Sequence, residues 1–244
     1  MKWIQSLFYI ALTIIIFSCS KEEPKCSNCA NISLSKDMKV SILGDSYSTF
    51  QGYLSPNGNP TYYPNSRTEV MDVTQTWWYQ FITRNNLILE SNNSYSGSTV
   101  ARKPNVEGKS YIERYLELGN PDFIFVFGGT NDSWQDIPVG DYQYSDWKED
   151  DLLYFRPAFA YLLYELQQTY PKAQIVNLIN TDLKKDYKES MEIICQYYHI
   201  CNISLGDFEK IDGHPSKKGM GSIYQQITQI LIKKYSCLHS NVTY

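Results

Sequence analysis

The chain has 244 residues, a length that allows one sizeable hydrophobic core. Hydrophobic residues make up 43% of the sequence, which predicts a folded globular body rather than a disordered chain. The net charge is −4 and the basic residues form no stripe, so nucleic acid is not an expected partner. The 21 tyrosines carry flat apolar rings with hydroxyl groups, which suit contacts with sugars or peptides but also occur on ordinary surfaces.

The N-terminus has the pattern of an export signal. Lys2 supplies a positive charge, and the apolar run from Trp3 to Phe17 is short for a membrane span and typical of a signal-peptide core. The run ends in Phe17-Ser18-Cys19, which resembles the lipidation site of bacterial lipoproteins. We therefore expect residues 1–19 to be a lipoprotein signal peptide, with lipid attached at Cys19. The protein would be exported and lipid-anchored to the bacterial outer membrane or cell surface. A plain secretory signal and an uncleaved anchor are the alternatives.

The segment after the signal is polar. Residues 20–37 are predicted to be a flexible tether, and residues 38–236 a single folded domain. A Cys-x-x-Cys pair falls within the tether, outside the strand–helix setting of a redox motif. Exported proteins can form disulfides, but the spacing leaves the pairing open among Cys26, Cys29, Cys195, Cys201 and Cys237. The Cys and His spacing fits no zinc site, so no metal is expected.

The domain alternates between strand and helix patterns. In chain order, the patterns predict a strand at 39–43, a long loop at 51–72, a helix at 74–85, strands at 87–90 and 122–127, a helix at 151–170, a strand at 174–179, a helix at 184–198, a strand at 200–205 and a helix at 216–235. Pro157 is expected to start or kink the second helix, and Ser216 to cap the last. This alternation predicts an α/β fold with a parallel sheet covered by helices on both faces.

Three polar residues fall at the carboxyl ends of predicted strands, where ligands bind in parallel sheets. Ser46 follows the first strand, Asn131 the third, and His214 lies in a turn after the fifth. A serine hydroxyl becomes a nucleophile when a base such as histidine takes its proton, and an Asn amide suits a developing oxyanion. Taken singly, Ser46 also fits a helix cap and Asn131 a turn.

Together these residues resemble the SGNH hydrolases, also called the GDSL esterase family. Gly44-Asp45-Ser46 resembles the nucleophile block, Gly97 the glycine of the second block, Gly129-Thr130-Asn131-Asp132 the third block and His214-Pro215 the last. The resemblance covers about residues 38 to 235. It implies a three-layer α/β sandwich with a five-stranded, flavodoxin-like parallel sheet.

The same resemblance implies a serine esterase that needs no metal or cofactor. Ser46 would be the nucleophile and His214 the base. The main-chain N–H groups of Ser46 and Gly97 and the Asn131 amide would form the oxyanion hole.

One position departs from the family pattern. The family has an Asp three residues before the histidine, where this chain has Ile211. We expect Asp212 to take that role, because Gly213 can adopt unusual backbone angles and absorb the shift. Asp207, Glu209 and a Ser–His dyad oriented by a backbone carbonyl are the alternatives.

The substrate is less constrained by the sequence. Aromatic side chains near the predicted site suggest a sugar ring, so we expect an O-acetyl group on a carbohydrate. Alternatives are a lipid or aryl ester, or a glycan-binding surface lipoprotein without catalysis. The candidate aromatics are Trp77, Trp78, Trp134, Trp147, Tyr47, Tyr62 and Tyr63, although Trp77 and Trp78 also fit a helix core. The sequence leaves the oligomeric state open.

Overall fold

The computed structural model describes residues 24–104 and 109–232. The predicted signal peptide at 1–19, with Cys19, lies outside the described residues. Within the described part of the chain, no helix is both long and apolar enough to cross a membrane.

The centre of the fold is a six-stranded sheet in the order β1-β6-β5-β4-β2-β3. Five strands are parallel, in the order expected for a flavodoxin-like sheet. They are β2 (Lys39–Gly44), β3 (Ile88–Ser94), β4 (Phe123–Phe127), β5 (Gln174–Ile179) and β6 (Cys201–Ser204). Strand β4 is buried along its whole length, as its continuous apolar sequence predicts for a strand covered on both faces.

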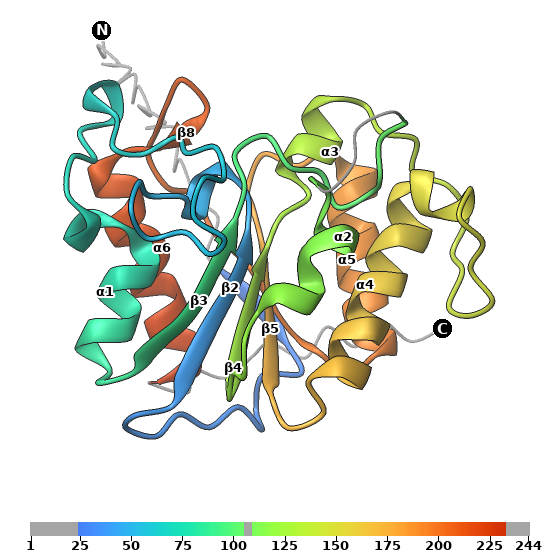
Figure 1. Cartoon of the computed structure of the whole chain (residues 1–244), viewed down its shortest axis with the longest axis horizontal. Helices are drawn as coiled ribbons and strands as arrows, with labels where there is room; N and C mark the ends of the chain where they lie inside the picture. The colour runs from blue at the N-terminus through green and yellow to red at the C-terminus, as the bar shows by residue number, and fades with distance from the viewer. Residues whose placement is uncertain (1–23, 105–108, 233–244) are drawn as a thin grey trace, which may run out of the picture.

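Helices cover both faces of the sheet, which confirms the predicted three layers (Figure 1). One face is covered by α1 (Trp77–Arg84) and α6 (Lys217–Leu231). The other is covered by α2 (Tyr111–Arg114), α4 (Phe155–Thr169) and α5 (Lys185–Tyr197). Pro157 lies in the first turn of α4, where the missing N–H has no helical partner to lose. Ser216 caps α6, as predicted, by accepting from the Gly219 N–H.

Short elements connect these layers at the carboxyl edge of the sheet. The 3-10 turn η1 (Ser46–Ser48) follows β2, and the one-turn helix α3 (Thr130–Trp134) follows β4. A two-residue hairpin joins β7 (Lys210–Ile211) to β8 (His214–Pro215) ahead of α6. The other 3-10 turns are η2 (Ser66–Thr68), η3 (Val73–Gln75), η4 (Tyr115–Glu117) and η5 (Asp151–Leu153).

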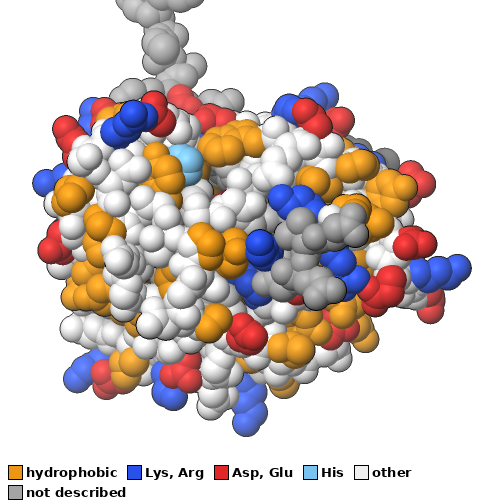
Figure 2. All heavy atoms as spheres, turned by 45° about the horizontal axis from the view of Figure 1, so that its top comes forward, with side chains coloured by type: hydrophobic (Ala, Val, Ile, Leu, Met, Phe, Trp, Pro, Cys, Tyr) orange, Lys and Arg blue, Asp and Glu red, His pale blue; other side chains and the backbone are white. Residues whose placement is uncertain are grey.

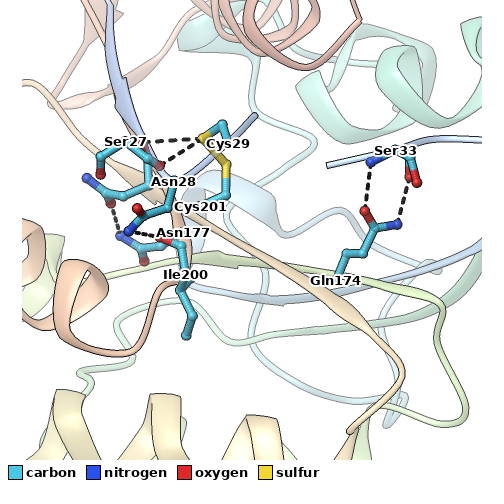
Figure 3. Close-up of a disulfide and its surroundings, with 9 residues drawn as sticks. Ser27, Asn28, Cys29, Ser33, Gln174, Asn177, Ile200 and Cys201 are labelled. Atoms are coloured by element: carbon cyan, nitrogen blue, oxygen red, sulfur yellow. Dashed lines mark hydrogen bonds between the residues drawn. A yellow bond between two sulfur atoms is a disulfide. The ribbon is translucent and has the colours of Figure 1, made fainter. Parts of the chain in front are cut away.

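The predicted flexible tether over residues 20–37 is wrong for most of the residues that the structure describes. Strand β1 (Lys25–Ser27) pairs antiparallel with β6 and adds a sixth strand to the five expected. A disulfide joins Cys29 to Cys201 of β6, and Gln174 of β5 accepts from the Ser33 N–H and donates to its carbonyl, each at 2.7 Å (Figure 3). Polar composition concealed this because an edge strand bonds through its backbone, whatever its side chains are.

Candidate active site

The predicted site residues converge at the point where the strand order reverses. Ser46 follows β2 and Asn131 follows β4, and these two strands are hydrogen-bonded neighbours. The β7–β8 hairpin brings His214 to the same edge, which lies uppermost in Figure 1. Crevices at such switch points are where open α/β sheets bind ligands.

Ser46 and His214 form a hydrogen-bonded pair. The Ser46 Oγ lies 3.0 Å from the His214 Nε2, within the range expected between a nucleophile and its base. Ser46 is the first residue of η1 and not its cap, because the Asp45 carboxylate accepts from the Tyr47 N–H. Burial lowers the pKa of His214 below its usual 6.5, which favours the neutral imidazole that can accept a proton.

Asp212 orients His214 through its main chain and not through its carboxylate, which corrects the predicted role of that side chain. The His214 Nδ1 lies 3.0 Å from the Asp212 carbonyl oxygen. The Asp212 carboxylate points elsewhere and pairs with Arg67 at 3.1 Å. Glu209, another candidate, accepts instead from the Ser216 Oγ. The arrangement is therefore the Ser–His dyad with a backbone carbonyl.

The hairpin geometry explains this outcome. Asp212 and Gly213 have φ of +52° and +76°, the left-handed values that a type I′ two-residue turn requires at both positions. Such a turn places His214 directly across the ladder from Ile211, so its ring lies beside the Asp212 carbonyl. Asp-Gly is the strongest short hairpin signal that a sequence can carry, and this signal would have revealed the turn.

The three predicted oxyanion donors lie in turns at the same edge of the sheet. Gly97 has φ +83° in the turn after β3, and Asn131 donates from Nδ2 to the carbonyl of Ser98, the next residue. That bond uses one of the two amide hydrogens and fixes the other. The main-chain N–H groups of Ser46 and Gly97 make no hydrogen bond to another described residue. Ser46 is buried, and buried N–H groups without a protein partner are rare, which suits its N–H to a ligand, while Gly97 is exposed.

Buried charged residues hold the oxyanion side of the site, and we assigned them no role from the sequence. Arg114, 3% exposed, donates to the carbonyl of Gly44 (3.2 Å) and to the Ser98 hydroxyl (2.9 Å), and so bridges two blocks. Asp132 accepts from the N–H groups of Val100 (2.8 Å) and Ala101 (3.0 Å). No local pattern marks Arg114, because its partners Gly44 and Ser98 are 70 and 16 positions away in the sequence.

The buried carboxyls of Asp45 and Asp132 both have raised pKa values. Burial raises the pKa of Asp132 to about 7, against the opposing effect of its two N–H donors. Burial also raises the pKa of Asp45 to about 7, with a smaller contribution from the charge of Asp132. Burial lowers the pKa of Arg114 to about 10, so its guanidinium stays charged at neutral pH.

Aromatic rings surround the imidazole of His214. The Tyr62 ring stacks on it at 3.5 Å between centroids and 6° between planes. Tyr47 and Trp134 approach at 5.5 and 5.9 Å, and Trp134 stays 43% exposed. Figure 2, which brings this edge forward, shows a histidine at the surface between hydrophobic side chains.

The rings of the remaining aromatic candidates make no ring contact with His214. Trp77 and Trp78 are buried in the core beneath α1, so the alternative of a helix core is the correct one for both. Trp147 packs on Tyr161 and Tyr164 of α4. Tyr63 is buried behind Tyr62.

No group of three or more His, Cys, Asp or Glu side chains could hold a metal within the ranges 24–104 and 109–232. Among the cysteines, Cys195 has a buried free thiol whose pKa burial raises.

A parallel sheet with a Ser–His pair and oxyanion donors at its switch point defines a serine hydrolase of the SGNH type. The chain belongs to the GDSL-like lipase/acylhydrolase family, whose model matches residues 38–231. Membership of this family makes the chain an esterase in general terms. No curated protein matches the sequence.

Solved structures agree with this assignment. A structure described as a GDSL-like lipase from Bacteroides ovatus is 46% identical, with a TM-score of 0.79, covering 82% of this chain and 100% of that one. A second, from Bacteroides uniformis, is 48% identical, with a TM-score of 0.78 and coverage of 82% and 97%. An acetyl xylan esterase from the rumen bacterium Butyrivibrio proteoclasticus shares the fold at 17% identity, with a TM-score of 0.56 and coverage of 83% and 65%.

Proposed function

We propose that this protein removes an O-acetyl group from a carbohydrate through an acyl-enzyme on Ser46. The observation that carries the proposal is the 3.0 Å contact between the Ser46 Oγ and the His214 Nε2, beside N–H groups with no partner among the described residues. A hydroxyl, its base and oxyanion donors are the parts that acyl transfer needs.

The proton and the bonds can be followed through one cycle. The Ser46 oxygen attacks the ester carbonyl as His214 takes the hydroxyl proton at Nε2. The carbonyl oxygen becomes an oxyanion held by the N–H groups of Ser46 and Gly97 and by the Asn131 amide. The C–O bond to the alcohol breaks, and His214 gives its proton to the departing oxygen. Water, deprotonated by His214, then attacks the acyl-enzyme and releases acetate and free Ser46.

The carbohydrate assignment rests on the leaving-group side of the site. His214 must face the departing alcohol to protonate it, so groups beside His214 contact that alcohol. Trp134 is exposed there, and its ring lies against Gly213 of the hairpin. An exposed indole is a flat apolar surface of the kind that stacks on a sugar ring. The fold is also that of an acetyl xylan esterase, although the low identity restricts that likeness to the fold.

Two measurements test the proposal. A fluorophosphonate probe should label the purified protein and fail to label Ser46→Ala. Acetate release from acetylated xylan should exceed release from an acetylated lipid, and Trp134→Ala should raise KM for the xylan more than for p-nitrophenyl acetate. Labelling that persists in Ser46→Ala would reject the nucleophile. Binding of xylan without hydrolysis would favour the non-catalytic alternative, and equal loss on both esters in Trp134→Ala would reject the sugar platform.

We also propose that the protein is exported and lipid-anchored at Cys19. The disulfide between Cys29 and Cys201 supports export, because disulfides persist in oxidising compartments. Expressed in a bacterial host that processes lipoproteins, the chain should partition with membranes, and Cys19→Ser should release it. Membrane association that survives Cys19→Ser would contradict the lipid anchor.

A further inference from the structure

Among the described residues, no carboxylate is hydrogen-bonded to the imidazole of His214. When His214 takes the proton of Ser46 it becomes an imidazolium, which a carboxylate partner stabilises in the triad arrangement. Here Nδ1 meets the neutral carbonyl of Asp212, which fixes the tautomer but carries no full charge. A further group that contacts the ring face would add to the stabilisation of the charged form.

The ring of Tyr62 has the position that such a group needs. It lies parallel to the imidazole, with 3.5 Å between centroids and 6° between planes. The face of an aromatic ring carries negative electrostatic potential and attracts cations within about 6 Å of its centroid. Because both rings are partly buried, the attraction is screened less than on an open surface.

Hydrogen bonds tie this ring to the nucleophile. The Tyr62 N–H donates to the Thr49 Oγ1 at 2.9 Å, and that hydroxyl donates to the Ser46 carbonyl at 3.0 Å. The main chain of Tyr62 is therefore tied through Thr49 to the main chain of the nucleophile.

Two more tyrosines fix the turn that carries His214. The Tyr47 hydroxyl donates to the Gly213 carbonyl, and the Tyr63 hydroxyl donates to the Pro215 carbonyl at 2.7 Å. The carbonyls on either side of His214 are thus both held by buried tyrosines. Tyr47 is fixed in turn by Asn180, whose Nδ2 donates to its hydroxyl at 3.3 Å.

We propose that Tyr47, Tyr62 and Tyr63 form a clamp that replaces the catalytic acid. Tyr47 and Tyr63 hold the His214 turn in register with Ser46, and the Tyr62 ring face stabilises the imidazolium. The clamp residues are positioning residues, since they contact His214 and its turn. This inference rests on the proposed function of the Ser46–His214 pair.

The charged and titratable groups around the imidazole come from several elements. Lys210 of β7 opposes the imidazolium, and the carboxylate of Asp212 in the turn favours it. Arg67 of η2 pairs with that carboxylate and weakens its effect. Tyr47 and Tyr62 face the ring as neutral groups, because burial raises the pKa of both hydroxyls. The charges of Lys210 and Asp212 act in opposite directions, and the Tyr62 ring face adds to the support that the Asp212 carbonyl and carboxylate give to the imidazolium.

Replacing Tyr62 separates the ring face from the hydroxyl. Tyr62→Leu removes the face, so kcat on p-nitrophenyl acetate should fall about two- to thirtyfold, with KM little changed. Loss of cation stabilisation disfavours the protonated form, so the acid limb of the pH profile should move to lower pH. Tyr62→Phe keeps the aromatic ring face, so kcat and the position of the acid limb should both stay as in the wild type. Tyr142→Leu, an exposed tyrosine beside Arg156, is the matched control and should change neither.

A second measurement keeps the clamp testable whatever the activity. The pKa of His214 can be read by proton NMR, with its signal assigned by His214→Gln. The pKa of His214 should fall by about 0.4 to 1.5 pH units in Tyr62→Leu and stay unchanged in Tyr62→Phe. An unchanged pKa in a folded Tyr62→Leu, or equal losses in the Leu and Phe variants, would overturn the proposal. If Ser46→Ala proves fully active, the proposed function fails, and the NMR result still decides whether Tyr62 supports the imidazolium.

Discussion

The two halves of the active site are held together by different chemistry. On the nucleophile side, Arg114, Asp132 and Asp45 are buried, and the first two bond to main-chain atoms of the blocks that carry Ser46 and Gly97. On the base side, His214 is held by a backbone carbonyl, a stacked ring and two tyrosine hydroxyls.

This difference predicts how each half responds to mutation. A buried carboxylate that satisfies two N–H groups leaves both without partners when it is removed, which is costly. When an aliphatic side chain replaces a stacked ring, the electrostatic attraction of the ring face is lost but the packing contact is partly kept. We therefore expect large effects on the nucleophile side and graded ones on the base side.

The largest effect is expected from Asn131→Ala. The Asn131 amide is held by the Ser98 carbonyl at 2.9 Å, so its free hydrogen is oriented before substrate binds. Losing one preorganised oxyanion donor costs about a hundred- to a thousandfold in kcat. Steady-state kinetics on p-nitrophenyl acetate measure this, with the exposed Asn120→Ala as control. A loss below tenfold would mean that Asn131 is not an oxyanion donor.

Asp132→Ala should show what the buried charges contribute to stability. It leaves the Val100 and Ala101 N–H groups without partners, so the free energy of unfolding should fall by about 3 kcal/mol. Asp132→Asn keeps one acceptor oxygen, so its free energy of unfolding should fall by roughly half as much. Urea unfolding measures both, and the exposed Asp141→Ala should stay within about 0.5 kcal/mol of the wild type. Equal stability of the Ala and Asn variants would contradict the account.

The pH dependence of kcat/KM should report the base side. His214 must be neutral to accept the serine proton, so activity falls as the pH drops through its pKa. Burial places that pKa below 6.5, so activity should persist at pH 6.5 and be half-maximal at a lower pH. Circular dichroism over the same range shows whether the protein stays folded. If the acid limb of kcat/KM lies above pH 6.5 while the protein stays folded, burial does not lower the pKa of His214.

The same contrast explains how far the sequence could predict the structure. The parallel strands and the order Ser46, Gly97, Asn131, His214 follow from local patterns, because strands, turns and blocks are contiguous in the chain. The supports of the site are not contiguous. Arg114 bonds to Gly44 and Ser98, and Tyr62 lies over a histidine 152 positions later in the sequence (214 minus 62). Such partners become neighbours only through the sheet order.

Strand β1 and the orientation of Asp212 were missed for related reasons. Strand β1 pairs through backbone atoms that every sequence has, so its polar residues gave no sign of it. In the turn, two positive φ angles direct the Asp212 carboxylate to Arg67 and its carbonyl to His214. We correctly expected Asp212 to lie beside His214. Whether its carboxylate or its carbonyl oxygen contacts the His214 Nδ1 depends on the backbone angles that the Asp-Gly pair favours.

The smallest effect is expected from Asp212→Asn, which distinguishes this site from a triad. Asn tolerates the left-handed conformation that this position requires, so the turn and its carbonyl should persist. If the carbonyl alone orients His214, kcat should stay within a few-fold of the wild type. Replacing a true triad acid by its amide costs about ten-thousandfold. Loss of the Arg67 pair should matter little, because exposed ion pairs contribute about 0–1 kcal/mol, and Arg67→Gln provides the control for it. A loss of a thousandfold or more in Asp212→Asn, with normal activity in Arg67→Gln, would show that the carboxylate turns toward His214 during the reaction.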